Sequence, residues 1–152
     1  MNKLLLVLLL LFAPLTQASE RLSEDAVYEL YAQMHRAVER MDSQAVMALM
    51  SADVQVHILA PADMGGEIRL SRDEYRELLV QGWDGVESYR LEVDIKDIEI
   101  ADDGQSARID SLNREAMDIL GNTLVTNIEL RATLRLNQGQ ALFSHIQAVV
   151  RP

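Results

Sequence analysis

The sequence predicts a single α+β domain in which three helices from the N-terminal half of the chain pack against a curved antiparallel sheet. Two observations predict this class. In the first half, apolar residues recur at three- and four-residue steps, the period of an amphipathic helix, whereas in the second half they alternate with polar residues, as in a half-buried strand. The chain of 152 residues is also long enough to bury a substantial core. We expect the domain to span residues 19–152.

The N-terminal segment, residues 1–18, has the pattern of a secretory signal peptide. Lys3 precedes a wholly apolar run from Leu4 to Phe12, and the small residues Thr16 and Ala18 lie three and one positions before a cleavage point. The apolar run is far shorter than the roughly 20 residues of a membrane-spanning helix. We therefore expect cleavage after Ala18, a periplasmic or secreted protein, and no membrane anchor in the mature chain.

The composition limits the classes of partner and cofactor. The chain has 24 acidic and 14 basic residues, a net charge of −10, and loss of Lys3 on cleavage leaves 13 basic residues and −11. Such a chain repels nucleic acid, so we expect no nucleic-acid partner. It has no cysteine, which excludes disulfides and thiol chemistry. We expect no cofactor and no metal, because there is no glycine-rich phosphate loop and His35, His57 and His145 lie on different predicted elements without ligand spacing.

Capping residues mark the starts of the three helices. Ser23 and Asp42 can accept hydrogen bonds from the free N–H groups of a first and a short second helix. Ser71 and Glu74 form a capping box that opens the third helix. The apolar faces contain Val27, Leu30, Tyr31, Met34, Val38 and Met41; then Val46, Leu49 and Met50; then Tyr75, Leu78, Leu79, Gly82 and Trp83. All three helices are therefore amphipathic and require a surface to pack on.

Four long strand-like runs follow the third helix and supply that surface. Their turns lie at Asp102-Asp103-Gly104, Gly121-Asn122 and Gln138-Gly139, and a further extended segment, residues 54–61, precedes the third helix. In the first long run the apolar residues have odd numbers up to Ile95 but even numbers from Ile98 onward. The simplest cause of this change of phase is a β-bulge, which would bend the sheet.

A row of polar residues interrupts the apolar face of the second long run. Ser111, Asn113 and Glu115 have the same parity as the apolar residues Ile109 and Met117, so all five are expected to point toward the core. Spaced polar groups in an apolar cavity are typical of ligand pockets, where they orient the ligand. The row therefore predicts a pocket.

The turns set the register of the last three runs. A two-residue loop at Gly121-Asn122 pairs Asn113 with Leu130. A two-residue loop at Gln138-Gly139 turns Phe143, His145, Gln147 and Val149 toward the core. A three-residue loop, Asn137-Gln138-Gly139, instead turns Leu142, Ser144, Ile146 and Ala148 inward and buries more apolar surface. Strand periodicity alone is compatible with both alternatives.

The order of elements resembles the nuclear transport factor 2-like superfamily, in particular its small SnoaL-like members. The resemblance covers residues 22–152 and rests on that order, on Ala52-Asp53-Val54-Gln55-Val56, on the Asp-Gly turn before Ala107 and on the ending FSHIQAVVRP. It implies a cone-shaped sheet with a pocket between sheet and helices, used by relatives for binding, for isomerisation and cyclisation of polycyclic substrates, or for assembly. It also implies an inward His145, which favours the two-residue loop.

The resemblance does not extend to a complete isomerase site. Steroid isomerases of this superfamily hold a carboxylate base near the position of Ile58, and the neighbouring His57 has the parity of the outer face. In those enzymes an inward acid and a tyrosine hold the oxyanion. Glu115 and Tyr31 can be pictured in these roles, although no motif specifies them. On a flat sheet the Cα of Glu115 lies roughly 16 Å from the row of His145, too far for a direct hydrogen bond.

Three interpretations follow. The first, which we favour because the isomerase base is absent and the polar residues are spread, is an exported domain that binds a small apolar or polycyclic molecule. The second is a cofactor-independent isomerase, cyclase or dehydratase in which His145 or Glu115 moves a proton. The third is a module that dimerises through the outer sheet face, where Val125, Ile146 and Val150 are expected to be exposed; a homodimer is compatible with all three. The candidate ligand-binding residues are Tyr31, Trp83, Ser111, Asn113, Glu115, His145 and Gln147.

Each candidate also has a purely structural interpretation. Glu115 can lie in water at the mouth of the cone or pair with an arginine, and His145 can be a hydrogen-bonded core histidine. Tyr31 and Trp83 have the helical spacing of ordinary core residues.

Overall fold

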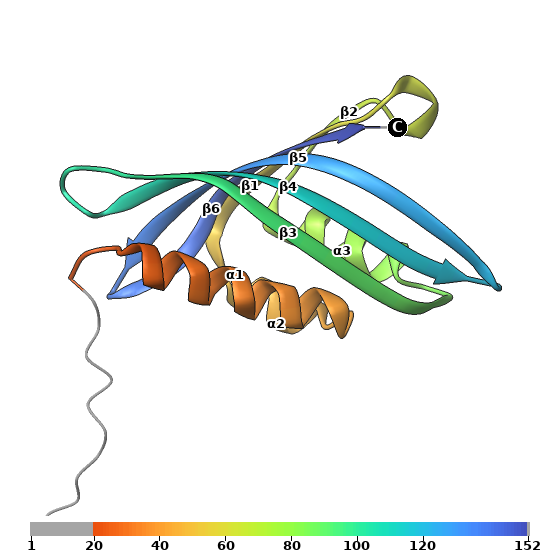
Figure 1. Ribbon diagram of the computed structural model, residues 1–152, viewed down its shortest axis with the longest axis horizontal. Coiled ribbons are helices and arrows are strands. Elements are labelled where there is room, and N and C mark those ends of the chain that lie inside the picture. The colour runs from red at the N-terminus through yellow and green to blue at the C-terminus, as the bar shows by residue number, and fades with distance from the viewer. Residues whose placement is uncertain (1–19, 152) are drawn as a thin grey trace, which may run out of the picture.

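The computed structural model describes residues 20–151, which form three α-helices, one short 3-10 helix and six strands (Figure 1). The elements are α1 (Glu24–Glu39), α2 (Ser43–Ala48), β1 (Met50–Leu59), η1 (Ala62–Met64), β2 (Glu67–Leu70), α3 (Arg72–Gly82), β3 (Val86–Ile100), β4 (Ser106–Ile119), β5 (Asn122–Asn137) and β6 (Gln140–Arg151). The predicted helices and long strands are confirmed, whereas the short strand β2 was not predicted. The predicted signal peptide lies outside the described residues.

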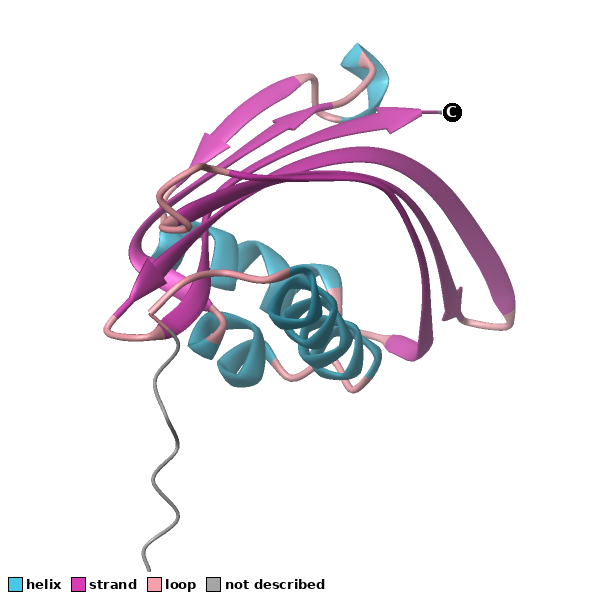
Figure 2. Cartoon of the chain, turned by 60° about the vertical axis from the view of Figure 1, so that its left-hand side comes forward, coloured by secondary structure: helices cyan, strands magenta, loops and turns pink. Residues whose placement is uncertain are grey.

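The strands form one curved sheet in the order β2-β1-β6-β5-β4-β3. All neighbours are antiparallel except β1 and β6, which run parallel. The sheet arches over the helices, which lie on its concave side, and it does not close into a barrel (Figure 2). This arrangement confirms the predicted α+β class with a cone-shaped sheet on three helices.

The predicted helix caps are present. The side chains of Ser23 and Asp42 accept hydrogen bonds from the backbone N–H groups three residues later, at 3.2 and 3.0 Å. Ser71 and Glu74 exchange the two hydrogen bonds of a capping box. Each cap of this kind contributes about 1 kcal/mol to helix stability, so local sequence fixes where the helices begin.

The core lies at one end of the concave side and leaves the other end less tightly covered. Its fully buried side chains come from α1, α2, β1, β4 and β5: Val27, Val46, Val54, Val56, Ile109 and Leu134. Along β4, burial decreases from Ile109 to the half-buried Met117. Leu124, which pairs with Met117, is 52% exposed although it shares the inner parity. The inner face is therefore sealed at one end and accessible at the other.

The predicted β-bulge in β3 is confirmed. Ile95 pairs with Ser111 and Asp97 pairs with Asp110, so the intervening Lys96 has no partner on β4. This extra residue returns the apolar side chains that follow to the inner face and bends the edge strand around the helices.

The β4–β5 turn differs from the prediction by one residue. Its two central residues are Leu120 and Gly121, with φ of 49° and 76°, rather than Gly121-Asn122. A tight hairpin turn needs two positive φ angles, and the strand pairing begins at Asn122. As a result Asn113 pairs with Ile128 and not with Leu130. The register shifts by two residues, so the side chains of β4 and β5 keep their predicted faces.

The last strand combines both predicted alternatives. Gln138 and Gly139 form the two-residue loop, and Phe143 pairs with the buried Leu134. A second bulge then follows, because Thr133 pairs with His145 and leaves Ser144 as the extra residue. The Ser144 hydroxyl donates to the Thr133 carbonyl at 3.1 Å.

This second bulge reverses the predicted orientation of the strand's end. Ile146 and Ala148 are buried on the inner face, whereas His145 is exposed on the outer face and Gln147 is half-buried there. The prediction of an inward His145 and Gln147 is therefore wrong. Burial of Ile146 removes apolar surface from water, while an inward imidazole would have needed a buried hydrogen-bond partner.

Candidate functional site

The polar row predicted on β4 lies on the inner face of the sheet. Ser111 is only 3% exposed, and Asn113 and Glu115 are half-buried. The Ser111 hydroxyl donates to the Asn113 side-chain oxygen at 3.0 Å. The expectation that the three side chains share the face of Ile109 and Met117 is thus confirmed.

Tyr31 reaches this row from α1. Its ring is 8% exposed and packs edge-on against Phe143, with the ring centroids 5.4 Å apart. Burial raises the pKa of Tyr31, and the nearby Ser111 hydroxyl opposes that rise. Among residues 20–151 the buried Tyr31 hydroxyl has no well-aligned hydrogen-bond partner. The structure therefore leaves one neutral polar group free to interact on the inner side.

Glu115 lies among aromatic side chains from three elements. Tyr89 on β3 shares a hydrogen bond with it, and Tyr75 on α3 is close enough for the two groups to affect each other's ionisation. Trp83, the residue that caps α3, packs edge-on against Tyr89 with centroids 6.3 Å apart. Burial raises the pKa of Glu115, and the hydrogen bond from Tyr89 opposes that shift.

Glu115 has no ionic partner in the part of the chain that the structure describes. The arginine pair considered from the sequence is therefore not formed. Its two tyrosine neighbours were not among the predicted site residues. Tyr89 has the inward parity of Leu91, which pairs directly with Glu115, so strand parity could have identified it.

A cleft of about 550 Å³ lies between α1 and the edge strand β3. Its walls include Tyr28, Tyr31 and His35 on α1 and residues 91–95 on β3. One oxygen of Glu39, at the end of α1, lies 3.0 Å from His35 Nε2 and accepts a hydrogen bond from Leu91 N at 3.1 Å. The backbone hydrogen bond is the main reason that the pKa of Glu39 is lowered. Glu39 thus connects α1 to β3 beside the cleft, and the β3 residues of the cleft pair with the strand that carries the polar row.

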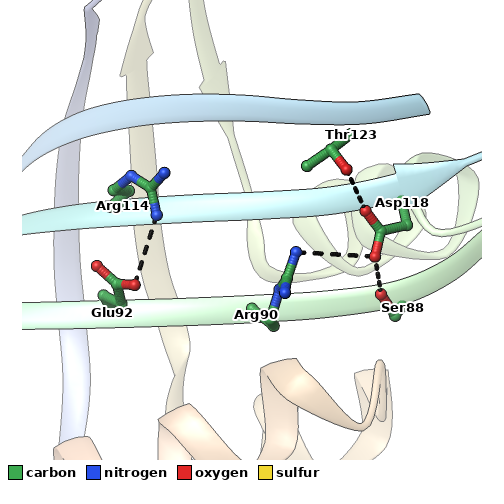
Figure 3. A network of polar contacts seen from close by, with 6 residues as sticks. All are labelled: Ser88, Arg90, Glu92, Arg114, Asp118 and Thr123. Carbon is green, nitrogen blue, oxygen red and sulfur yellow. Dashed lines mark hydrogen bonds and ion pairs between the residues drawn. The ribbon is translucent and has the colours of Figure 1, made fainter.

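The outer face of the sheet has a different character. The network around Asp118 in Figure 3 illustrates it: Ser88 and Thr123 donate hydrogen bonds to the carboxylate at 2.5 and 2.6 Å, and Arg90 lies 3.8 Å away. These contacts lower the pKa of Asp118. Nearby, Arg114 pairs with Glu92 at 3.4 Å.

Ion pairs continue over this outer face, two of them within one strand and three across neighbouring strands. The pairs are Glu67–Arg69, Asp94–Lys96, Glu99–Arg108, Asp110–Arg131 and Glu129–Arg151. Gln147 lines a shallow groove of about 350 Å³ among them, with Lys96 and Arg131. His57, predicted outside the pocket, lies on this face and contacts Glu67 at 2.9 Å. Of the seven candidates, the structure therefore brings Tyr31, Ser111, Asn113, Glu115 and Trp83 to the inner side and leaves His145 and Gln147 outside.

Two further features of the described residues bear on function. No helix among them is long and apolar enough to cross a membrane. No cluster of three or more histidine or acidic side chains within residues 20–151 could hold a metal ion.

The curved, unclosed sheet over three helices, with a polar row on its inner face, defines a protein of the nuclear transport factor 2-like class. The SnoaL-like domain family model matches residues 27–150. The chain therefore belongs to the SnoaL-like domain family. Among curated proteins, none matches the chain significantly.

Solved structures agree on the fold. A conserved protein from Planctomyces limnophilus has 17% sequence identity and a TM-score of 0.70, with 85% of this chain and 96% of that chain covered. A ketosteroid isomerase-like protein from Erwinia carotovora atroseptica has 17% identity, a TM-score of 0.66 and coverage of 84% and 95%. A putative scytalone dehydratase from Novosphingobium aromaticivorans has 14% identity, a TM-score of 0.69 and coverage of 85% and 84%. At these identities the likeness shows the fold alone.

Proposed function

We propose that this domain binds a small, mainly apolar molecule on the inner side of the sheet. The observation that carries the proposal is Glu115, a carboxyl group in an aromatic environment without an ionic partner among the described residues. Burying an unpaired carboxyl opposes folding, and an apolar residue of similar volume would serve a purely structural role better. A polar group in this position is explained if it contacts a ligand.

A cleft on the same side of the sheet supports this proposal, because Leu91 in its wall pairs with Glu115 on the neighbouring strand. The cleft of about 550 Å³ between α1 and β3 has the size of a small-molecule site, for which about 300–1,000 Å³ is typical. The buried hydroxyl of Tyr31, which has no well-aligned partner among residues 20–151, offers a further polar group beside Ser111. Leu124 and the half-buried Met117 and Ile128 leave apolar surface of the inner face exposed. An apolar ligand would cover that surface while the polar row orients it.

The test is native mass spectrometry of the purified full chain, with collision energy raised to release any bound molecule. We expect a defined extra mass on the wild type, and at least a tenfold weaker retention in Glu115→Gln. A matched control is Glu129→Gln on the outer face. Wild-type protein that carries no ligand and binds none of a panel of apolar small molecules in calorimetric titrations would refute the proposal.

A second candidate function is proton-transfer catalysis with Glu115 as the acid or base. The raised pKa of Glu115 favours this function, because a general acid or base works best when its pKa is close to the working pH. The names of two fold relatives, an isomerase-like protein and a putative dehydratase, are compatible with such chemistry. His145, the other proton carrier considered, lies on the outer face and cannot reach a ligand on the inner side. Turnover of a retained ligand by the wild type, lost in Glu115→Gln, would establish catalysis.

We also propose that the chain is exported to the periplasm or secreted. The pattern of residues 1–18 supports this, and the residues that follow the predicted cleavage point include Leu22, which packs into the domain. Leu22 is 6% exposed, and its N–H donates to the Gly104 carbonyl at 2.8 Å. Cell fractionation and the intact mass of the product test the proposal. We expect an exported chain that starts at Ser19, whereas a cytoplasmic chain that retains residues 1–18 would contradict it.

We also propose that the chain forms a homodimer through the outer face of the sheet. Leu112 and Val125 are 45% and 42% exposed there and lie among charges that are already paired. Ile146 and Val150, which were expected to add exposed apolar surface, lie on the inner side of the sheet because of the bulge in β6. Sedimentation equilibrium should give a dimer that Leu112→Glu converts to a monomer. A monomeric wild type at high protein concentration would refute this interface.

A further inference from the structure

Four neighbouring side chains on the inner side of the sheet combine a carboxyl group with aromatic rings. Glu115 comes from β4, Tyr89 from β3, and Tyr75 and Trp83 from α3 and its C-terminal cap. We call this group the aromatic carboxyl site. It brings together segments that are distant in the sequence, and Trp83 and Tyr89 lie edge to face. The rings are fixed by packing rather than carried on a loop.

The chemistry of this site is specific for a positive charge. An ionised carboxyl group accepts hydrogen bonds on two oxygens, and Tyr89 supplies one donor. Aromatic ring faces carry partial negative charge and attract ammonium groups, with an attraction that grows when water is excluded. An anionic ligand would be repelled by the carboxylate, and a neutral apolar ligand would leave its charge uncompensated.

We propose that the aromatic carboxyl site binds an ammonium or alkylammonium group, so that the ligand of this domain is an apolar amine. The inference rests on the proposed function, because it requires a ligand on the inner side of the sheet. It names the charge class of that ligand. The carboxylate of Glu115 pairs with the cation, and Tyr75, Tyr89 and Trp83 surround its alkyl groups.

The charge distribution over the molecule favours a cationic ligand. Most basic residues of the sheet lie in ion pairs on the outer face, where acidic side chains compensate their charge. On the helical side, α1 carries Glu24, Asp25, Glu29 and Glu39 against Arg36. With a net charge of −10, the chain attracts cations to its helical side and repels anions.

The pH dependence of binding separates a cation from a neutral ligand. The groups that face Glu115 are Tyr89 from β3 and Tyr75 from α3, while its partner on β5, Thr126, carries no titratable group. Both tyrosines stay neutral at physiological pH, because burial raises the pKa of each. Of these three groups, Glu115 is therefore the one that an acidic pH can protonate, and burial raises its pKa. A cation needs its ionised form and binds more weakly as pH falls, whereas a carbonyl or hydroxyl acceptor needs the protonated form and binds more tightly.

The experiment uses two rigid probes of the same size and shape, 1-aminoadamantane and 1-adamantanol. Isothermal titration calorimetry with the full chain measures both at neutral and at mildly acidic pH. We expect the amine to bind at least tenfold more tightly than the alcohol at neutral pH and to weaken as the pH is lowered. Glu115→Gln should remove the preference for the amine, and Glu129→Gln on the outer face should preserve it.

The outcomes separate this inference from the proposed function. If the alcohol binds as tightly as the amine, or if the amine binds more tightly at lower pH, the cation site is refuted while the apolar pocket stands. If neither probe binds, the inference is refuted, and the native mass spectrum then decides independently whether any ligand is retained. Should Glu115→Gln fail to fold by circular dichroism, Trp83→Leu and the wild-type pH profile provide the same test.

Discussion

The two faces of the sheet differ in whether their charged side chains have ionic partners. On the outer face of β3 to β6, acidic and basic side chains pair across neighbouring strands, as in Asp110–Arg131 and Glu129–Arg151. On the inner face, Glu115 has tyrosines as neighbours and no ionic partner among the described residues. Because successive residues of a strand point to opposite sides, adjacent positions such as Arg114 and Glu115 serve the two faces separately.

This difference indicates which charges serve folding and which serve ligand binding. Exposed ion pairs contribute little to stability, because water and salt screen them. Charged side chains on an open sheet do, however, oppose its aggregation. A carboxyl group without an ionic partner in aromatic surroundings opposes folding. Contact with a ligand would compensate this cost. We therefore expect outer-face changes to affect neither ligand nor fold strongly, and inner-face changes to affect one or both.

The largest contrast is expected between Ile109 and Leu112. Ile109 is fully buried on the inner face, and Leu112 is 45% exposed on the outer face. Ile109→Ala should lower the free energy of unfolding by about 2–5 kcal/mol, since it leaves a cavity in the sealed end of the core. Leu112→Ala, measured at a dilution at which the proposed dimer dissociates, should change it by no more than about 0.5 kcal/mol. Urea denaturation followed by circular dichroism measures both, and equal losses would contradict the exposure of Leu112.

The next contrast concerns ligand retention by Asn113 and His145. Asn113→Leu should keep the fold and reduce retention at least tenfold, because the side chain lies in the inner polar row. His145→Leu should leave retention unchanged, since the imidazole lies on the outer face. Native mass spectrometry of both variants beside the wild type makes the comparison. Loss of ligand in His145→Leu alone would contradict the assignment of the two faces.

Local signals in the sequence predicted much of this architecture. Ser23, Asp42 and Ser71 mark helix starts because capping is a short-range interaction between a side chain and the next turn. The bulge in β3 was predictable, since it changes the parity of the apolar residues that follow Ile95. Parity along β4 likewise predicted the inward polar row.

The features that sequence reasoning missed depend on contacts between distant segments. The bulge at Ser144 leaves Phe143, Ile146 and Ala148 on the inner face, a pattern that fits neither simple register. The Ser144 hydroxyl stabilises this bulge by binding the carbonyl of Thr133 on the neighbouring strand. Likewise the surroundings of Glu115 depend on how α3 lies across β3 and β4. No local rule places Tyr75 and Tyr89 beside the same carboxyl group.

A smaller effect is expected in the pH dependence of stability, where the two faces should have opposite signs. Burial raises the pKa of Glu115, so the folded state holds its proton more tightly than the unfolded state and this residue destabilises the fold as pH rises above about 4.5. Glu115→Gln should therefore become more stable relative to the wild type between pH 4.5 and neutral pH. Urea denaturation across that range measures it, and a constant difference would show that Glu115 is fully solvated.

On the outer face, hydrogen bonds lower the pKa of Asp118, so its contribution is present above its unfolded pKa of about 3.8 and is lost as pH falls through its folded pKa. Asp118→Asn should accordingly be less stable than the wild type at neutral pH, with a difference that disappears in acid. The same urea titrations, extended to lower pH, provide the measurement. A difference that grows in acid would contradict the hydrogen bonds from Ser88 and Thr123.

The smallest effect is expected for an isolated ion pair of the outer face. Asp110 and Arg131 form a two-point contact with distances of 2.7 and 3.2 Å, yet the two side chains are 33% and 56% exposed to water. A double-mutant cycle with Asp110→Asn and Arg131→Gln should give a small favourable coupling that decreases as salt is added, because mobile ions screen exposed charges over about 8–10 Å. At a dilution at which the proposed dimer dissociates, a coupling that is large and insensitive to salt would contradict the exposure of this pair. The same cycle repeated at higher protein concentration tests whether a second copy of the chain then covers the pair and excludes water from it.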